Sequence, residues 1–231
     1  MGNTQPSQPL KARPPHECPY FCCCAELLKS LELPERYFTA RYNMCYCEEC
    51  SRRRKDKRFY PRADKQYGLP EGWTRFSLQL ESYKLKYFDL WHRAYHGTTF
   101  KNVSSILENG LVVPGTYVGG GDSVSTRKGH FNDHFGPADF DTEQIFLSPS
   151  IKYVEMEAYS TTQTVRVNRK RYQAKVAFQA LIRPDSYSVG PQTTGRKSPI
   201  DPPLPNSEME WSTSDSDDII LYGILIKIID Y

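Results

Sequence analysis

The spacing of apolar residues predicts a chain that alternates short strands with a few short helices. Strands are expected where β-branched and aromatic residues gather over strand length; these segments are residues 72–80, 94–98, 144–148, 172–182 and 219–228. The longest apolar run, IILYGILIKII, is too short to span a bilayer and is interrupted by Gly223 and Lys227. The pattern predicts an α+β protein without a membrane span.

The first predicted helix follows a run of three cysteines. The stretch CCCAELLKSLELP begins at Cys22 and places Leu27, Leu28 and Leu31 on one face at helical spacing. Pro34 ends it, because proline cannot continue a helix. We therefore expect a short amphipathic helix here.

Two further helices are expected between the strands. FKNVSSILENG (100–110) has apolar residues at helical spacing and Gly110 where a C-terminal cap belongs. SPSIKYVEMEAY (148–159) starts with Ser148 as N-cap and Pro149 in the first helical position. The residues around them, 115–142 and 188–207, are rich in Gly, Pro, Ser and Asp, which predicts long loops.

Composition and charge narrow the function classes. The chain has 231 residues, of which 39% are hydrophobic and 25% charged, as in a folded soluble domain with room for a small appendage. Thirty Lys and Arg against 27 Asp and Glu leave a net charge of +3, so a nucleic-acid partner is not expected. The basic run SRRRKDKR (51–58) is interpreted as a solvated face.

All seven cysteines lie in the first fifty residues. Residues 1–17 carry four prolines and little apolar content, which predicts a disordered leader rather than a secretory signal. We therefore expect reduced thiols and a cytoplasmic or nuclear protein that is not secreted. Gly2 leaves N-terminal myristoylation open, although Pro6 stands where Ser or Thr is wanted.

The spacing Cys45-x-Cys47-x2-Cys50 lets three thiolates converge on one tetrahedral zinc ion. The residues able to complete the site are His16, Cys18, Cys22, Cys23 and Cys24, and we include Cys18, Cys22 and Cys24 among the candidate ligands. Four protein ligands leave no open position, so this zinc would stabilise the fold. The alternative is a set of free buried cysteines. We expect a zinc module over 18–60 and a second domain over 61–231.

The segment RAYHGT (93–98) is a weak signal alone, but three features follow it in order: a glycine-rich loop at 119–129, the strand and turn IFLSPSIKY, and an acidic pair before Trp211. This order resembles the ADP-ribosyltransferases of the poly(ADP-ribose) polymerase type. The resemblance implies a split, mostly antiparallel β-sheet domain with a cleft for NAD. The pair His130 and His134 is a weaker alternative metal motif.

A longer set of blocks covers most of the chain from Cys18 onward. The cysteine cluster, YGLPEGWTRF, WHRAYHGT, IFLSPSIKY and EMEW together are similar to the C-terminal domain of neuralized-like proteins. The large Neuralized repeats of that family are absent from this sequence, so the roles tied to them are not transferred.

The resemblance also implies roles for individual residues. The cofactor-binding set would be His96, Gly97, Thr98, Phe146, Ser150 and Tyr153. His96 would bind a ribose hydroxyl, the backbone of Gly97 would hold the nicotinamide amide, and Tyr153 would stack on the nicotinamide ring. Ser150 would be a second partner of the amide. Phe146 stands where the family usually has Tyr, which keeps an aromatic face and loses a hydroxyl.

A late carboxylate completes the implied site. Cleavage of the ribose–nicotinamide bond develops positive charge on the sugar, which a carboxylate stabilises in the transition state. Glu210 is the first candidate and Glu208 the second, because residues two apart on a strand share a face. An exposed acidic pair at the end of a loop is the alternative interpretation.

The implied function is transfer of a single ADP-ribose from NAD to a protein acceptor, with release of nicotinamide and with His96 and the glutamate as catalytic residues. Two alternatives stay open. One is a protein that kept the fold as a scaffold or interaction module without turnover. The other is NAD-dependent removal of a 2′-phosphate from RNA, which the modest net charge does not favour.

Overall fold

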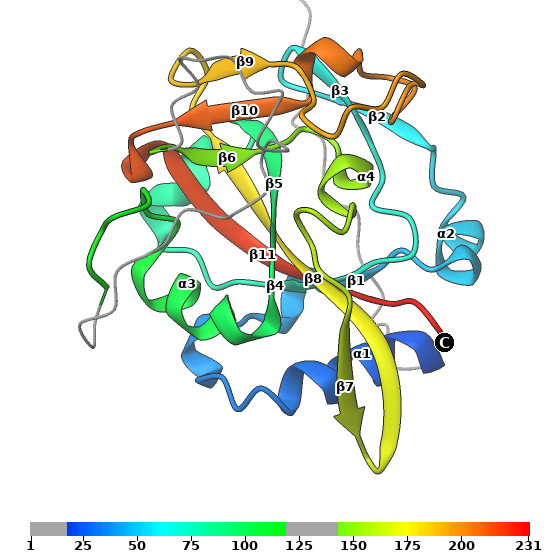
Figure 1. Ribbon diagram of the computed structural model, residues 1–231. Helices are drawn as coiled ribbons and strands as arrows, with labels where there is room; N and C mark the ends of the chain where they lie inside the picture. The colour runs from blue at the N-terminus through cyan, green and yellow to red at the C-terminus, as the bar shows by residue number, and fades with distance from the viewer. Residues whose placement is uncertain (1–17, 119–142) are drawn as a thin grey trace, which may run out of the picture.

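The computed structural model describes residues 18–118 and 143–231 (Figure 1). Three expectations lie outside the described residues. They are the leader at 1–17, the glycine-rich loop at 119–129, and the histidines His16, His130 and His134.

Two antiparallel sheets form the centre of the fold. The larger has the order β1–β4–β11–β8–β5, with β7 added to β8. Its strands are β1 (Met44–Cys45), β4 (Thr74–Ser77), β11 (Ile219–Ile228), β8 (Lys170–Ile182), β5 (His92–Thr98) and β7 (Gln163–Val167). The two long strands coincide with the two most apolar segments of the sequence, as predicted.

The smaller sheet crosses above the long strands in Figure 1. It has the order β6 (Ile145–Leu147), β10 (Glu210–Thr213) and β9 (Ser188–Gly190). Tyr95 of β5 joins it to the larger sheet, because its backbone N–H and C=O both bond to Ser148, at 2.8 and 3.0 Å. A hairpin of β2 (Phe59–Arg62) and β3 (Lys65–Gly68) stands apart from both sheets.

All strand pairs in the described ranges are antiparallel. The prediction of an α+β protein with mostly antiparallel sheets is therefore confirmed. Four α-helices accompany the sheets in this part of the chain: α1 (Pro19–Lys29), α2 (Glu48–Arg54), α3 (Val103–Asn109) and α4 (Ile151–Val154). Six 3-10 turns connect these elements: Glu35–Tyr37, Ala40–Tyr42, Ser82–Tyr87 (η3), Phe100–Asn102, Asn206–Glu208 (η5) and Ser216–Asp218.

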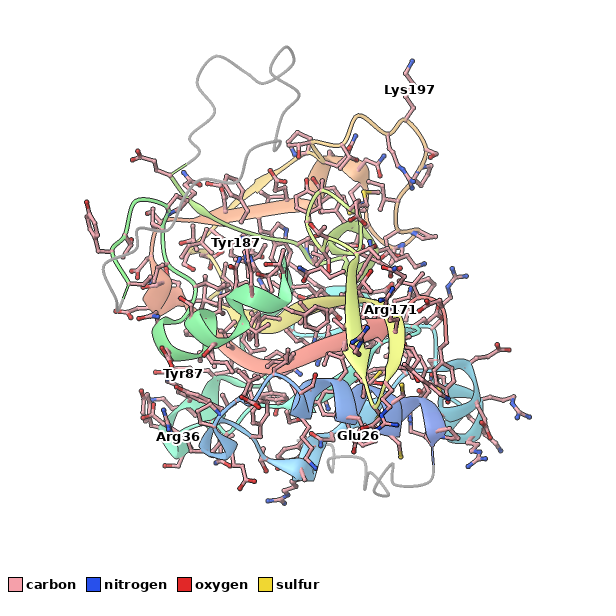
Figure 2. All side chains as sticks on the ribbon, turned by 60° about the horizontal axis from the view of Figure 1, so that its bottom comes forward. Glu26, Arg36, Tyr87, Arg171, Tyr187 and Lys197 are labelled. Atoms are coloured by element: carbon pink, nitrogen blue, oxygen red, sulfur yellow. The ribbon has the colours of Figure 1, made fainter. Side chains whose placement is uncertain are left out.

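Helix α1 covers one face of the larger sheet. It buries Phe21, Cys24 and Leu27, three positions at helical spacing, against the core that also contains Phe178 and Ile224. Figure 2 brings this side forward and shows Glu26 on the outer surface of the helix. The N-terminal segment thus shares the main core of the protein.

The helix expected over 148–159 is much shorter than predicted. Ser148 is paired with Tyr95 as an isolated strand bridge, so it does not serve as the N-cap. Ser150 takes that place, since its side chain accepts a hydrogen bond from the backbone N–H of Tyr153. Among the described residues, no helix combines the length and apolar character that a membrane crossing requires.

Candidate functional site

The first candidate site is a group of four thiols, here called the thiol cluster: Cys18, Cys45, Cys47 and Cys50. Their sulfur atoms all lie within 4.8 Å of one another. The Sγ of Cys18 is 3.8 Å from that of Cys45 and 3.7 Å from that of Cys47. Four thiols gathered in this way match the ligand set of a structural zinc ion.

The fold brings the four thiols together from three elements. Cys18 is the N-cap of α1, and Cys45 ends β1. Cys47 is the N-cap of α2, whose first turn contains Cys50. The positive ends of two helix dipoles therefore face the cluster, which favours thiolates over thiols.

The ionisation of the cluster also suits a cation. Burial opposes ionisation of Cys18, but the Phe21 N–H and the neighbouring thiols of the cluster lower the pKa of Cys18 overall. Burial, followed by hydrogen bonds with the thiols of Cys18 and Cys47, raises the pKa of Cys50 to about 12, and burial also raises the pKa of Cys45. Only part of the cluster ionises on its own, and a bound cation would supply the positive charge that ionises the rest.

Two of the predicted ligands lie outside the cluster. Cys24 is fully buried in the core, where its thiol contacts the backbone oxygen of Ile226 at 3.9 Å. Cys22 is exposed on α1. Among the described residues, only Cys18 joins the three thiols of the CYCEEC turn. The structure therefore selects Cys18 among the open alternatives and excludes Cys22 and Cys24 from the group.

The second candidate site surrounds Glu210, the first residue of β10. Glu210 is only 5% exposed. Its Oε2 accepts hydrogen bonds from the hydroxyls of Tyr153 at 3.0 Å, Tyr159 at 3.2 Å and Thr193 at 3.4 Å. The two tyrosine hydroxyls also contact each other directly. We call Glu210, Tyr153, Tyr159 and Thr193 the Glu210 cluster.

Burial and hydrogen bonding act on Glu210 in opposite directions. Removal from water raises the pKa of its carboxyl group, and the three hydroxyl donors lower it, with a net upward shift. Burial, followed by the charge of Glu210, raises the pKa of Tyr153 to about 12. Both tyrosines therefore keep their protons at neutral pH and donate hydrogen bonds to the carboxylate.

His96 reaches the strand next to Glu210. Its Nδ1 lies 2.9 Å from the backbone oxygen of Phe146, so Nδ1 carries the proton in this contact. Phe146 pairs with Ser212 of β10, two residues beyond Glu210. In the neutral ring the other nitrogen, Nε2, is then an acceptor.

Gly97 packs against a residue that the sequence did not indicate. A Cβ atom at position 97 would lie 2.8 Å from the carbonyl carbon and oxygen of Tyr159. The ring of Tyr159 lies 4.6 Å from that of Tyr153, at an angle of 46°. Tyr159 therefore fills the space between Gly97 and the carboxylate of Glu210.

Ser150 and Thr98, two further residues of the expected cofactor-binding set, are both buried. Ser150 is buried and donates to Asp201 Oδ2 at 2.8 Å, while its oxygen accepts from Tyr153 N–H at 3.2 Å. It thus fixes the start of α4 and the position of Tyr153. Thr98 is buried at the end of β5, on the sheet face opposite that of Gly97.

The prediction that Glu208 and Glu210 lie on the same face of one strand is wrong. Glu208 ends the turn η5 and is exposed, whereas β10 begins only at Glu210. The two carboxylates are therefore not neighbours on one strand face, and only Glu210 faces the protein interior.

No family model matches this chain. Sequence reasoning missed Tyr159 and Thr193, because both lie outside regular helices and strands and follow no spacing rule. The arrangement offers a buried carboxylate, an imidazole and aromatic rings at the junction of two sheets, a set of groups suited to stabilising developing positive charge.

Proposed function

We propose that the protein transfers ADP-ribose from NAD to a protein acceptor, with His96, Tyr153 and Glu210 in the site. One observation carries the proposal. These three residues come from β5, α4 and β10 and lie where the two sheets meet. The hydroxyl of Tyr153 donates a hydrogen bond to Glu210 at 3.0 Å. The ring of His96 forms a hydrogen bond with β6, the strand that pairs with β10. The resemblance to ADP-ribosyltransferases and to the neuralized-like C-terminal domain supports the same assignment.

In this reaction the bond between the ribose C1′ and the nicotinamide nitrogen breaks, and nicotinamide leaves with the electron pair. The acceptor side chain forms the new bond to C1′ and releases its proton to solvent. Glu210 in its ionised form stabilises the positive charge that develops on the ribose. His96 binds a ribose hydroxyl, and Tyr153 contributes its ring face to the nicotinamide. NAD is the substrate rather than a resident cofactor.

We further propose that the thiol cluster holds a zinc ion with a structural role. The four thiols occupy every position of a tetrahedral ion, so none is open for a substrate. The ion would fasten the starts of α1 and α2 to the end of β1. Zinc binding would thus contribute directly to folding stability.

A second candidate function is a scaffold that keeps the fold without turnover. The position of Tyr159 favours it, because this side chain occupies the space between Gly97 and Glu210. Phe146, which lacks the hydroxyl expected in the family, is consistent with the same view. Binding of NAD would require Tyr159 to move.

Incubation of the purified protein with labelled NAD and candidate acceptors tests the proposal. We expect covalent label on protein for the wild type and loss of about 100-fold or more in rate for Glu210→Gln, since a charge-stabilising group typically contributes that much. His96→Ala is expected to lose label as well. Glu208→Gln is the matched control, because it removes the same charge at an exposed position two residues away.

The other outcomes identify the competing functions. Binding of NAD without label or nicotinamide release supports the scaffold. Consumption of NAD only in the presence of a 2′-phosphorylated RNA supports the phosphotransferase. Equal labelling by wild type and Glu210→Gln contradicts the proposed role of Glu210.

A further inference from the structure

Two arginines lie beneath the surface where the β2–β3 hairpin meets β5. Arg93 of β5 is 7% exposed, and the side chain of Arg62 of β2 is 11% exposed. Their guanidinium groups stack on aromatic rings: the Cζ of Arg93 is 4.9 Å from the ring centre of Tyr60, and that of Arg62 is 4.5 Å from that of Phe88. We call Arg62 and Arg93 the buried arginine pair.

The buried arginine pair has no close acid. In the described ranges its one carboxylate contact joins Arg62 Nη2 to Asp89 Oδ1 at 3.9 Å, beyond hydrogen-bonding distance. The side chain of Asp89 is 93% exposed, so water screens this contact strongly. Arg93 donates to the hydroxyl of Tyr60, which is neutral.

Several donors of this pair have no acceptor. They are Nε and Nη2 of Arg62 and Nε of Arg93, each buried and without a hydrogen-bond partner. The hydroxyl of Tyr222, close to both guanidinium groups, is also buried without a partner. Tyr222 sits where the pairing of β11 with β8 shifts, which turns its side chain toward Arg93, 5.7 Å from ring centre to Cζ.

Such an arrangement is costly for the folded state. Arginine keeps its charge in proteins, and a buried charge without a hydrogen-bonded counterion is strongly destabilising. The two like charges add to this cost: burial and the charge of Arg93 both lower the pKa of Arg62. Cation–π contacts with Tyr60 and Phe88 offset only part of it. A negative charge with several acceptor oxygens would offset the remainder.

We propose that the buried arginine pair binds a small inorganic oxyanion of the phosphate type. Its oxygens would accept hydrogen bonds from the guanidinium groups of Arg62 and Arg93 and from the hydroxyl of Tyr222. Arginine suits this ligand because its planar fork matches two oxygens at once. The anion must be small, since the pair is buried and packs against the rings of Tyr60 and Phe88.

This site is separate from the Glu210 cluster and does not depend on the proposed function. Arg93, Tyr95 and Gly97 share one face of β5, and Tyr95, fully buried, stands between the other two. Four residues of strand place Arg93 roughly 13 Å from Gly97. The anion therefore has a structural or regulatory role, apart from the transfer reaction.

Thermal unfolding in phosphate and in chloride at equal ionic strength tests the proposal. For the wild type we expect a saturable rise in Tm of about 5–10 °C at a phosphate concentration a hundred times its Kd. Arg62→Met and Arg62→Lys are expected to lose most of the rise, the latter because an ammonium group lacks the fork. Lys197→Gln is the control: it removes a charge from a side chain that extends into solvent (Figure 2) and should keep the full rise.

Isothermal titration of the folded wild type with inorganic phosphate provides a measurement that does not require the variants to fold. One phosphate site per chain in the wild type is the expected result, and no measurable binding overturns the proposal. Equal Tm values in phosphate and chloride overturn the proposal. An equal phosphate effect in wild type and Arg62→Met means an adventitious ion only, and overturns it too. So does a large destabilisation by Asp89→Asn without any phosphate effect, which would make Asp89 the counterion.

Discussion

Tyr159 lies against Gly97 so closely that a Cβ atom on Gly97 would be 2.8 Å from the carbonyl carbon of Tyr159. Carbon atoms that do not share a bond normally stay about 3.5–4.0 Å apart. This contact holds the segment after α4 against β5. Tyr159 belongs to that segment, and its hydroxyl donates a hydrogen bond to Glu210. The glycine of the HGT motif is thus required by a neighbouring backbone in this structure.

Gly97→Ala is expected to destabilise the protein by about 1–3 kcal/mol, the usual cost of overpacking a filled interior. The added methyl group meets backbone atoms of Tyr159, which cannot rotate away. Urea unfolding measures the change. Gly190→Ala is the control, because the nearest atom to its Cβ would be Glu210 O at an ordinary 3.7 Å. If Gly97→Ala lowers the free energy of unfolding no more than Gly190→Ala does, the close contact between Gly97 and Tyr159 is contradicted.

The fold was predictable where the sequence pattern reflects burial. The strands at 170–182 and 219–228 bury nearly every residue, so continuous apolar and β-branched runs identify them. Helices α1 and α3 follow helical spacing, and Gly110 ends α3 with a φ of 75°, as a capping glycine does. The short strand β9 was missed, since three residues carry too little pattern.

The sites were predictable only in part. Cys45, Cys47 and Cys50 are close in sequence, so their spacing determines their convergence, but the choice of Cys18 depends on where α1 begins. Tyr159 was missed because the chain after α4 follows no regular spacing. The choice between Glu208 and Glu210 depends on the first residue of β10, and strand boundaries are the least predictable feature of a sequence.

Zinc content distinguishes the ligands from the other cysteines. Cys47→Ser is expected to lose the metal, and Cys22→Ser to keep about one ion per chain, because Cys22 lies outside the thiol cluster. Cys24→Ser is expected to keep zinc and to lose about 1–3 kcal/mol, since a hydroxyl replaces a thiol in the core. Metal analysis and urea unfolding measure the two effects. Equal zinc in wild type and Cys47→Ser would exclude the cluster as a zinc site.

Tyr159→Phe is expected to shift the pH dependence of the proposed transfer reaction. The Tyr159 hydroxyl donates to Glu210 at 3.2 Å and lowers the pKa of this carboxyl group. Without it the pKa of Glu210 rises, so activity, which needs the ionised form, appears only at higher pH. The acidic limb of the kcat/KM profile measures this shift. Tyr83→Phe, at an exposed position, is the control, and identical profiles for wild type and Tyr159→Phe would contradict the coupling.

Glu210→Gln is expected to stabilise the protein at neutral pH, whether or not the protein is an enzyme. Burial raises the pKa of Glu210 in the folded state above its ordinary value of 4.5. Between that value and the raised pKa, the folded state holds a proton that the unfolded state has released, so the free energy of unfolding falls as pH rises. Glutamine does not ionise, so the variant avoids this fall in the free energy of unfolding.

The gain at pH 7 is expected to be about 0.5–2 kcal/mol, typical of replacing a strained functional group. It should shrink as pH is lowered toward 4.5, where the wild-type carboxyl is increasingly protonated in both states. Urea unfolding at a series of pH values measures it, with Glu208→Gln as the control for loss of an exposed charge. A difference between wild type and Glu210→Gln that does not change with pH would mean that burial leaves the ionisation of Glu210 unaffected, and the hydroxyl donors of Tyr153, Tyr159 and Thr193 would then compensate fully for the loss of water.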